Sequence, residues 1–257
     1  MHRPAACAGS FYPETRLDLE KAIASMLPQV EAAAPCAMIV PHAGYVYSGS
    51  TAGCAYARLG KSRFNRVALL GPAHRVWFKG IAMPRASRFE TPLGSVPVDR
   101  EACLQLASLP SVMESDAVHD GEHALEVQLP FLQTVLGDFS LIPLLVGETS
   151  PESVSLVIDR FMNEPRTLVL VSSDLSHFHP YDRAKAIDLS TAKSILALDP
   201  VLDHNRACGA TPINGLLISA RRFNLKPDLL DIRNSGDTAG EKSRVVGYAS
   251  FSFGEIS

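Results

Sequence analysis

The sequence lacks the features that identify several common classes of protein. Its five cysteines include no Cys-x-x-Cys pair, which argues against both a disulfide framework and a zinc ribbon. It has no Gly-x-Gly-x-x-Gly turn and no Gly-x-x-x-x-Gly-Lys loop, so no nucleotide cofactor is predicted. An excess of basic residues is also missing. The net charge of -3 gives no electrostatic reason to expect nucleic acid or an anionic membrane as a partner.

Long apolar runs are absent as well. None approaches the roughly 20 residues that span a bilayer, and residues 1–7 show no charged-then-apolar leader pattern. We therefore expect a cytoplasmic protein without a membrane partner. Because the chain has 257 residues and 46% of them are hydrophobic, it can bury one substantial core, and we expect a single domain over residues 1–257.

Strand-like and helix-like patterns alternate through most of the chain. This alternation predicts an α/β fold, a three-layer α/β/α arrangement with a largely parallel central sheet. The pattern at residues 80–99 predicts a hairpin at the sheet margin, and the polar residues 114–123 predict a loop. Pro130 is expected either to bend its helix or to mark the true start of that helix. Helices are expected at about 15–27, 50–59, 101–109, 124–136, 151–161, 181–198 and 211–223, and strands at about 38–40, 66–72, 139–146, 167–172, 228–232 and 245–253.

Three of the strand-like runs lead directly into segments that contain histidine. In open α/β sheets, ligands bind outside the carboxyl ends of the strands. If these strands are parallel neighbours, their imidazoles surround one crevice. The runs and their histidines are 38–40 before His42, 66–72 before His74 and 167–172 before His177.

His42 and His74 occupy equivalent positions after their strands, which suggests a pair of metal ligands. An anionic third ligand would strengthen such a site. Cys208 is the candidate, because it lies just before a helix, where the helix dipole favours a thiolate. The alternative is that Cys208 is a small buried hydrophobic residue.

A second group of polar residues follows the third run. Asp174 lies three residues before His177 and could fix the tautomer of its imidazole, so that His177 acts as a general acid or base. A capped turn is the structural alternative. Glu122 and His123, at the start of a helix, could hydrogen-bond a ligand imidazole or contact substrate. His2, His119 and His204 have no supporting context and are expected to be solvated.

Several longer motifs together resemble the Memo family, whose bacterial and archaeal members are also called AmmeMemoRadiSam system protein B. The motifs run through nearly the whole chain in the family's order. They are Pro-His-Ala-Gly-Tyr-Val-Tyr-Ser-Gly at 41–49, Gly-Pro-Ala-His at 71–74, Gly-Glu-His-Ala-Leu-Glu-Val-Gln-Leu-Pro-Phe at 121–131, Ser-Ser-Asp-Leu-Ser-His at 172–177, and Cys-Gly-Ala-Thr-Pro-Ile at 208–213.

The resemblance implies a fold like that of the class III extradiol dioxygenases. By the same resemblance, His42 and His74 match metal-binding histidines, and Cys208 matches the position where Memo proteins present cysteine and the dioxygenases use glutamate. His177 matches the dioxygenase catalytic histidine, and His123 matches another active-site histidine. Family members are linked with iron or copper, and the human relative also with phosphotyrosine-peptide binding.

Three functions remain open from the sequence. The first is a redox enzyme that uses one iron or copper ion, with zinc also compatible with the ligands, and acts on an unidentified small molecule. The second is a non-catalytic module that binds a peptide or phosphopeptide in the same crevice. The third is a zinc-dependent hydrolase, in which the metal activates water.

Overall fold

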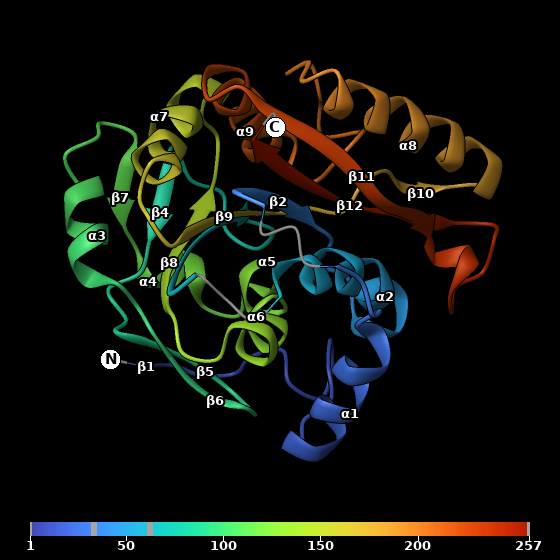
Figure 1. The fold of residues 1–257 in the computed structure, drawn as a ribbon, viewed down its shortest axis with the longest axis horizontal. Helices are drawn as coiled ribbons and strands as arrows, with labels where there is room; N and C mark the ends of the chain where they lie inside the picture. Colours follow the sequence, from blue (N-terminus) through green and yellow to red (C-terminus); the bar gives the residue numbers. More distant parts are fainter. Residues whose placement is uncertain (1, 32–34, 61–63, 256–257) are drawn as a thin grey trace.

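The structure is a computed structural model that describes residues 2–31, 35–60 and 64–255. Within these ranges, nine strands form one large sheet (Figure 1). Its order is β10-β12-β2-β9-β3-β8-β4-β7, and β11 pairs with β12 outside this path. The strands are β2 (Ala37–Val40), β3 (Arg66–Pro72), β4 (Ile81–Met83), β7 (Val112–Glu114), β8 (Ser140–Val146), β9 (Thr167–Ser172), β10 (His177–His179), β11 (Leu225–Asn234) and β12 (Val245–Glu255).

The centre of this sheet is parallel. β2, β9, β3 and β8 run in the same direction, and β12 and β4 flank them in antiparallel pairings with β2 and β8. Every residue of β2 and β9 is buried, as expected for strands that are covered on both faces. The carboxyl ends of β2, β9 and β3 therefore meet at one edge of the sheet. The predicted α/β fold with a largely parallel sheet is confirmed.

Helices cover both faces of the sheet (Figure 1). One group contacts β2, β3, β11 and β12, and the other contacts β3, β9, β11 and β12 from the opposite side. The first group consists of α1 (Arg16–Met26), α2 (Tyr45–Tyr56), α5 (His123–Glu126) and α6 (Leu129–Leu136), and the second of α7 (Pro151–Met162), α8 (Tyr181–Leu196) and α9 (Ala210–Arg222). The shorter helices α3 (Arg100–Leu106) and α4 (Asp116–His119) lie beside β8 and β4.

A small second sheet includes one strand from the amino-terminal arm, residues 2–15, which leads to α1. Its strands are β1 (His2–Arg3), β5 (Arg88–Thr91) and β6 (Gly94–Pro97), so β5 and β6 make the expected hairpin. Thr15 then caps α1 by accepting a hydrogen bond from the Asp18 amide, as its residue type predicts. The end of α1 packs closely on α2 at Gly53, where a Cβ atom would lie 1.9 Å from the Met26 carbonyl oxygen.

Some local expectations are wrong. The segment 114–123 contains the end of β7 and the helix α4, because the Asp116 carboxylate accepts the Arg85 amide hydrogen bond and ties the segment to the sheet. The buried imidazole of His119, expected to be solvated, places Nε2 3.0 Å from the Ala82 carbonyl oxygen. The helix expected over 124–136 is two helices, α5 and α6, and Pro130 lies in the first turn of the second.

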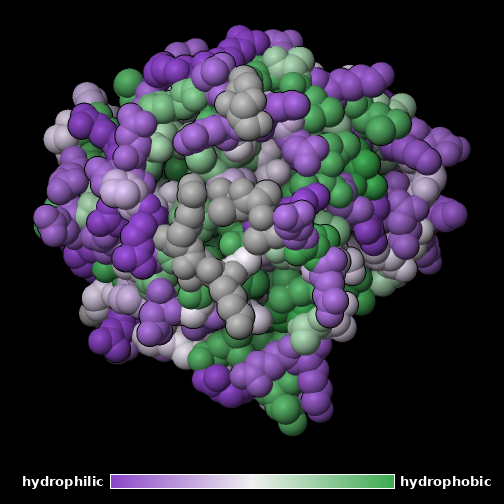
Figure 2. Space-filling model, in the orientation of Figure 1, coloured by the Kyte–Doolittle hydropathy of each residue, from purple (hydrophilic) through white to green (hydrophobic). Residues whose placement is uncertain are grey.

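The strands β7 and β10 were not expected either, since each has three residues and no clear apolar pattern. On the face seen in Figure 2, hydrophilic residues form most of the outline, and hydrophobic residues appear in smaller areas between them. Among the described helices, none combines the length and apolar character that crossing a membrane requires.

Candidate metal centre

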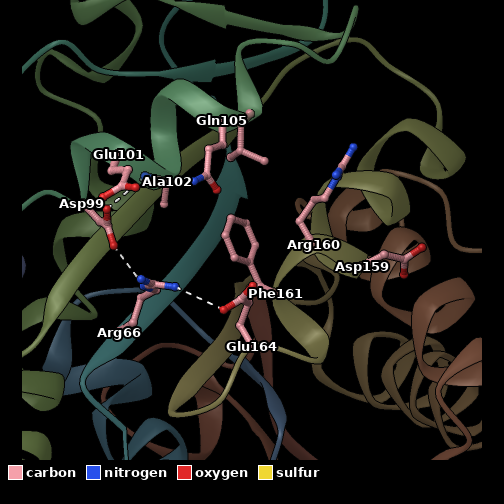
Figure 3. A pocket seen from close by; sticks show the side chains of 10 residues that line it. Arg66, Asp99, Glu101, Ala102, Gln105, Asp159, Arg160, Phe161 and Glu164 are labelled. Carbon is pink, nitrogen blue, oxygen red and sulfur yellow. Dashed lines mark hydrogen bonds and ion pairs between the residues drawn. The ribbon is translucent and has the colours of Figure 1, made fainter.

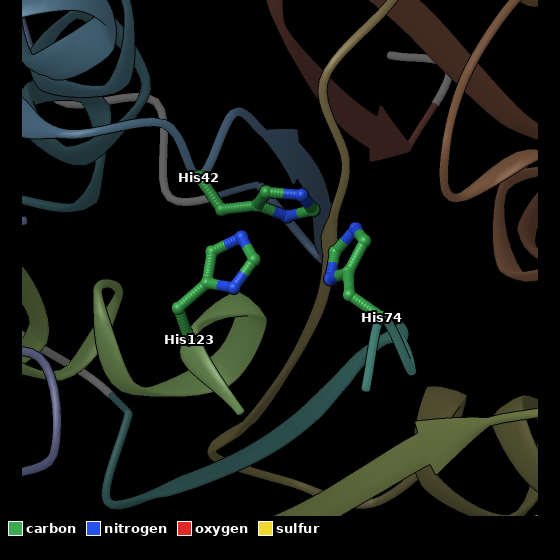
Figure 4. Close-up of side chains that lie close together, drawn as sticks. All are labelled: His42, His74 and His123. Atoms are coloured by element: carbon green, nitrogen blue, oxygen red, sulfur yellow. The ribbon is translucent and has the colours of Figure 1, made fainter. Parts of the chain in front are cut away.

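Three histidines from separate parts of the chain converge at the carboxyl edge of the central strands (Figure 4). His42 follows β2, His74 follows β3, and His123 opens α5. One ring nitrogen of each lies within 4.8 Å of the corresponding nitrogens of the other two. Imidazoles this close form the kind of donor set that binds a divalent transition metal. Two of these residues were predicted as ligands, whereas His123 was expected to support a ligand or to contact substrate.

Glu122 holds two of the three rings. Its Oε1 atom lies 2.9 Å from His74 Nδ1 and 3.2 Å from His123 Nδ1. Burial alone would raise the pKa of Glu122, but hydrogen bonds from His123 and His74 outweigh burial and hold that pKa well below its usual range. The carboxylate is therefore ionised and can only accept hydrogen bonds, so both Nδ1 atoms carry the proton. The Nε2 lone pairs of both histidines are left for a metal ion.

Ser172, at the end of β9, holds the third ring. Its Oγ atom donates to the Ala124 carbonyl oxygen at 2.5 Å and accepts from Gln128 Nε2 at 2.8 Å. His42 Nδ1, 2.9 Å from the same Oγ, must therefore donate to it. Burial, followed by the neighbouring imidazoles, lowers the pKa of His42 well below its usual value. The ring is neutral, and the lone pair of its Nε2 atom faces the Cys208 thiol. All three histidines thus fit a metal ion.

Cys208 lies against this centre, as the sequence suggested for a thiol ligand. Its Sγ atom is 3.2 Å from His42 Nε2 and 3.3 Å from the Asp174 amide nitrogen. Gly209 permits this close approach, because a Cβ atom there would lie 2.7 Å from the Ser173 side chain. Burial, and then the charge of Asp174, raises the pKa of the Cys208 thiol to about 12. A metal ion that binds this sulfur must therefore displace its proton.

Asp174 and His177 lie on the segment between β9 and α8. The buried Asp174 carboxylate accepts a hydrogen bond from the His42 amide at 2.8 Å, and burial raises its pKa. His177 Nδ1 lies 2.8 Å from the Leu175 carbonyl oxygen and donates to it. The Leu175 carbonyl thus sets the tautomer of His177, while Asp174 positions the loop of His42. The His177 Nε2 atom is left free to accept a proton.

The amino-terminal arm completes one wall of the centre. The Phe11 ring stacks on His123, which stacks in turn on His74, with ring centroids 4.5 and 4.6 Å apart. The fully buried Glu126 carboxylate holds the arm in place, because it accepts hydrogen bonds from the Tyr12 hydroxyl and the Cys7 amide. The sequence contains no signal that Phe11 reaches the site.

A cavity of about 620 Å³ opens beside the centre. His74, Cys208 and His177 are among the residues that line it. His204, expected to be solvated, is exposed and lines the same cavity, with Nδ1 3.3 Å from the Cys208 carbonyl oxygen. Residues from both predicted groups, His74 and Cys208 from the first and His177 from the second, therefore line a common space large enough for a small molecule.

A second cavity, of about 470 Å³, lies at the opposite end of the central strands (Figure 3). Three of its charged side chains pair with one another. Arg66 Nε lies 2.9 Å from Asp99 Oδ2, and Arg66 Nη1 lies 3.8 Å from Glu164 Oε2. None of the three converging histidines lines this cavity, so it is not the candidate site.

The chain resembles known proteins over nearly its whole length. Three relatives called MEMO1 family proteins come from Sulfolobus acidocaldarius, Ignicoccus hospitalis and Aeropyrum pernix. Their sequences are 36%, 34% and 36% identical to this one. The matches cover 99%, 98% and 96% of this chain and 100%, 98% and 97% of the relatives.

The fold is similar to that of a solved protein as well. The crystal structure of the uncharacterized protein JW3007 from Escherichia coli K12 superimposes with a TM-score of 0.53 and 13% sequence identity. The match covers 84% of this chain and 98% of that one, and at this identity it concerns the fold alone. The family described as Memo-like protein matches residues 3–252, and with the relatives above this match shows that the chain belongs to the Memo-like family.

Proposed function

We propose that this protein is a metal-dependent redox enzyme that uses iron or copper. His42, His74 and His123 would provide imidazole nitrogens, and Cys208 would provide a sulfur ligand. The observation that carries the proposal is the placement of a thiol 3.2 Å from His42 Nε2, beside imidazoles whose Nδ1 atoms are already engaged. Thiolate and imidazole together suit redox metals such as copper, and they also accept ferrous iron.

The residues around the centre have separate roles in this proposal. A bound iron or copper ion would supply electron-transfer chemistry and Lewis acidity. Glu122 and Ser172 keep the histidine rings oriented and in one tautomer. His177, which donates from Nδ1 to the Leu175 carbonyl, uses the free Nε2 to take a proton from a hydroxyl group of a substrate in the cavity.

A zinc-dependent hydrolase is the second candidate, and one observation favours it. Three neutral imidazoles beside an open cavity are also the donor set of some catalytic zinc sites, where the metal lowers the pKa of bound water. In this case Cys208 would not be needed for metal binding, and His177 would move the proton of the water molecule.

Metal content tests the proposal directly. The protein is purified anaerobically without a metal-affinity column, and its metals are measured by elemental mass spectrometry. We expect about one iron or copper ion per chain in the parent and clear loss in the His74→Ala and Cys208→Ala variants. Cys54→Ala is the matched control, because this cysteine lies in α2 outside the site and should leave metal content unchanged.

Each contrary outcome has a definite meaning. Zinc in the parent that Cys208→Ala retains would favour the hydrolase. Absence of any metal, before and after titration with ferrous, cuprous and zinc ions, would overturn both candidates. Redox function additionally requires oxygen uptake or metal reduction in the parent that His177→Ala slows while metal content stays the same.

A further inference from the structure

The cavity beside the metal centre has a distinctive distribution of polar and apolar groups. One wall consists of the side chains of Val76, Trp77, Phe78 and Val146. Glu148 also lines the cavity, and no lysine or arginine occurs among the described residues that line it. The cavity volume of about 620 Å³ lies within the range typical of small-molecule sites. Its volume and lining residues therefore suit a small, largely apolar ligand.

Trp77 has an unusual position for so large an apolar side chain. It is the single tryptophan of the chain and remains 74% exposed at the cavity wall. An indole ring attracts cations to its face and stacks well on other aromatic rings. An aromatic ligand with a positive charge would use both properties of this side chain.

Glu148 is the cavity's carboxylate, and its backbone is held firmly. Its amide donates to the Phe78 carbonyl oxygen at 2.9 Å, and its own carbonyl accepts from the Gly80 amide at 3.0 Å. Across the described part of the chain, no hydrogen bond or ion pair engages the Glu148 carboxylate. An exposed carboxylate that has no partner, beside an apolar wall, attracts a cationic group of a ligand that packs on that wall.

The same carboxylate disfavours the binding of anionic ligands. In the metal-free protein, a phosphate or carboxylate in this cavity would meet Glu148 without any guanidinium or ammonium group among the described lining residues to balance its charge. Discrimination against anions therefore comes from the same residue that favours cations.

We infer that the cavity takes a small aromatic amine in its protonated form, with the ring against Trp77 and the ammonium group beside Glu148. The inference rests on the proposed function in one respect: the other end of the ligand lies near His177 and the metal ligands, where the reaction would occur. The charge preference itself depends on the cavity residues alone.

Fluorescence of the single tryptophan measures binding at this place. The probes are phenethylamine, phenylpropionate and phenyl phosphate, which share a ring and differ in charge. We expect phenethylamine to change the Trp77 emission with a Kd at least about tenfold lower than that of either anion, a difference of about 1.4 kcal/mol. Isothermal titration calorimetry with the Trp77→Ala variant should show weaker binding of the amine.

Glu148→Gln is the decisive variant. It should raise the Kd for phenethylamine by about tenfold and remove the preference over phenylpropionate, while its melting temperature stays that of the parent. Glu152→Gln, an exposed carboxylate in the first turn of α7, is the matched control and should bind all three probes as the parent does. Equal binding of the three probes by the parent, tighter binding of either anion, or a preference that survives Glu148→Gln would overturn the inference.

The titrations are run on metal-free and metal-loaded protein. An amine preference in a protein that retains no metal would support the inference and remove the proposed redox function. Metal retention with no amine preference would overturn the inference and leave the proposed redox function in place.

Discussion

The ring of Phe11 stacks on the imidazole of His123 with their centroids 4.5 Å apart and their planes inclined by 25°. Residues from distant parts of the chain thus share one wall of the candidate metal centre. The Phe11 carbonyl oxygen also accepts the Tyr45 amide at the start of α2, just beyond His42. The arm therefore contacts two of the three segments that carry the imidazoles.

Removal of this ring should weaken metal binding. In Phe11→Ala, His123 loses the surface that restricts its rotation, so we expect the metal affinity to fall by about tenfold. The measurement is competition with a chromophoric chelator. Leu156→Ala, a truncation of an exposed side chain on α7, is the control. Unchanged affinity in Phe11→Ala would show that the hydrogen bond to Glu122 alone orients His123.

Glu122→Gln should have a larger effect on the same measurement. A glutamine amide has one oxygen, which leaves less acceptor capacity for His74 Nδ1 and His123 Nδ1 and lets the imidazoles change tautomer. We expect metal affinity to fall by about 10- to 100-fold. Glu148→Gln replaces a carboxylate in the cavity that contacts none of these nitrogens, and it should leave metal affinity unchanged.

Gly53→Ala tests the packing of α1 against α2. The added Cβ atom would lie 1.9 Å from the Met26 carbonyl oxygen, so the two helices must separate. We expect the free energy of unfolding in urea to fall by about 3 kcal/mol. Gly254→Ala should have little effect, since nothing lies within 4 Å of a Cβ atom at that position.

Asp188 should give stability an unusual pH dependence. Burial raises the pKa of its carboxyl from 3.8 to about 6, although the Ser176 amide donates to it. Between these two values the folded protein retains a proton that the unfolded chain has lost, so this residue's contribution to stability falls as the pH rises from about 4 to about 6. An asparagine side chain at this position would not titrate, so the variant would not lose stability in this way as the pH rises.

The comparison is therefore between Asp188→Asn and the parent. Relative to the parent, the variant should gain about 3 kcal/mol of unfolding free energy between about pH 4 and about pH 6, with no further gain above. Urea unfolding across this range measures the difference. Asp138→Asn, at an exposed position, should show no such trend. A constant difference would mean that Asp188 titrates normally in the folded protein.

The site residues that could be predicted from the sequence are those that directly follow a buried strand. Buried strands have a simple apolar pattern, and whatever follows them must lie at the sheet edge, so His42 and His74 could be placed from the sequence. Cys208 could be proposed from its position before a helix, but nothing in its neighbours distinguishes a ligand from a buried apolar residue.

The remaining parts depend on contacts between distant segments. Whether His123 faces the other histidines depends on where α5 begins and on the stacking of Phe11. Ser172 ends a strand as an ordinary small polar residue, and its role appears only when His42 and Gln128 lie beside it. Tertiary packing, rather than local pattern, decides each of these placements.

The pairing of β12 has a consequence for the protein while it is being synthesised. β12 follows all the other strands of the described residues, yet it lies between β10 and β2, with Phe251 opposite Ile39. Until residues 245–255 have left the ribosome, β2 has an open edge, and β10, which carries His177, lacks its strand partner. A nascent chain can therefore bring His42 and His74 together before the His177 side of the crevice exists, so a metal that enters early would meet a site still open on that side.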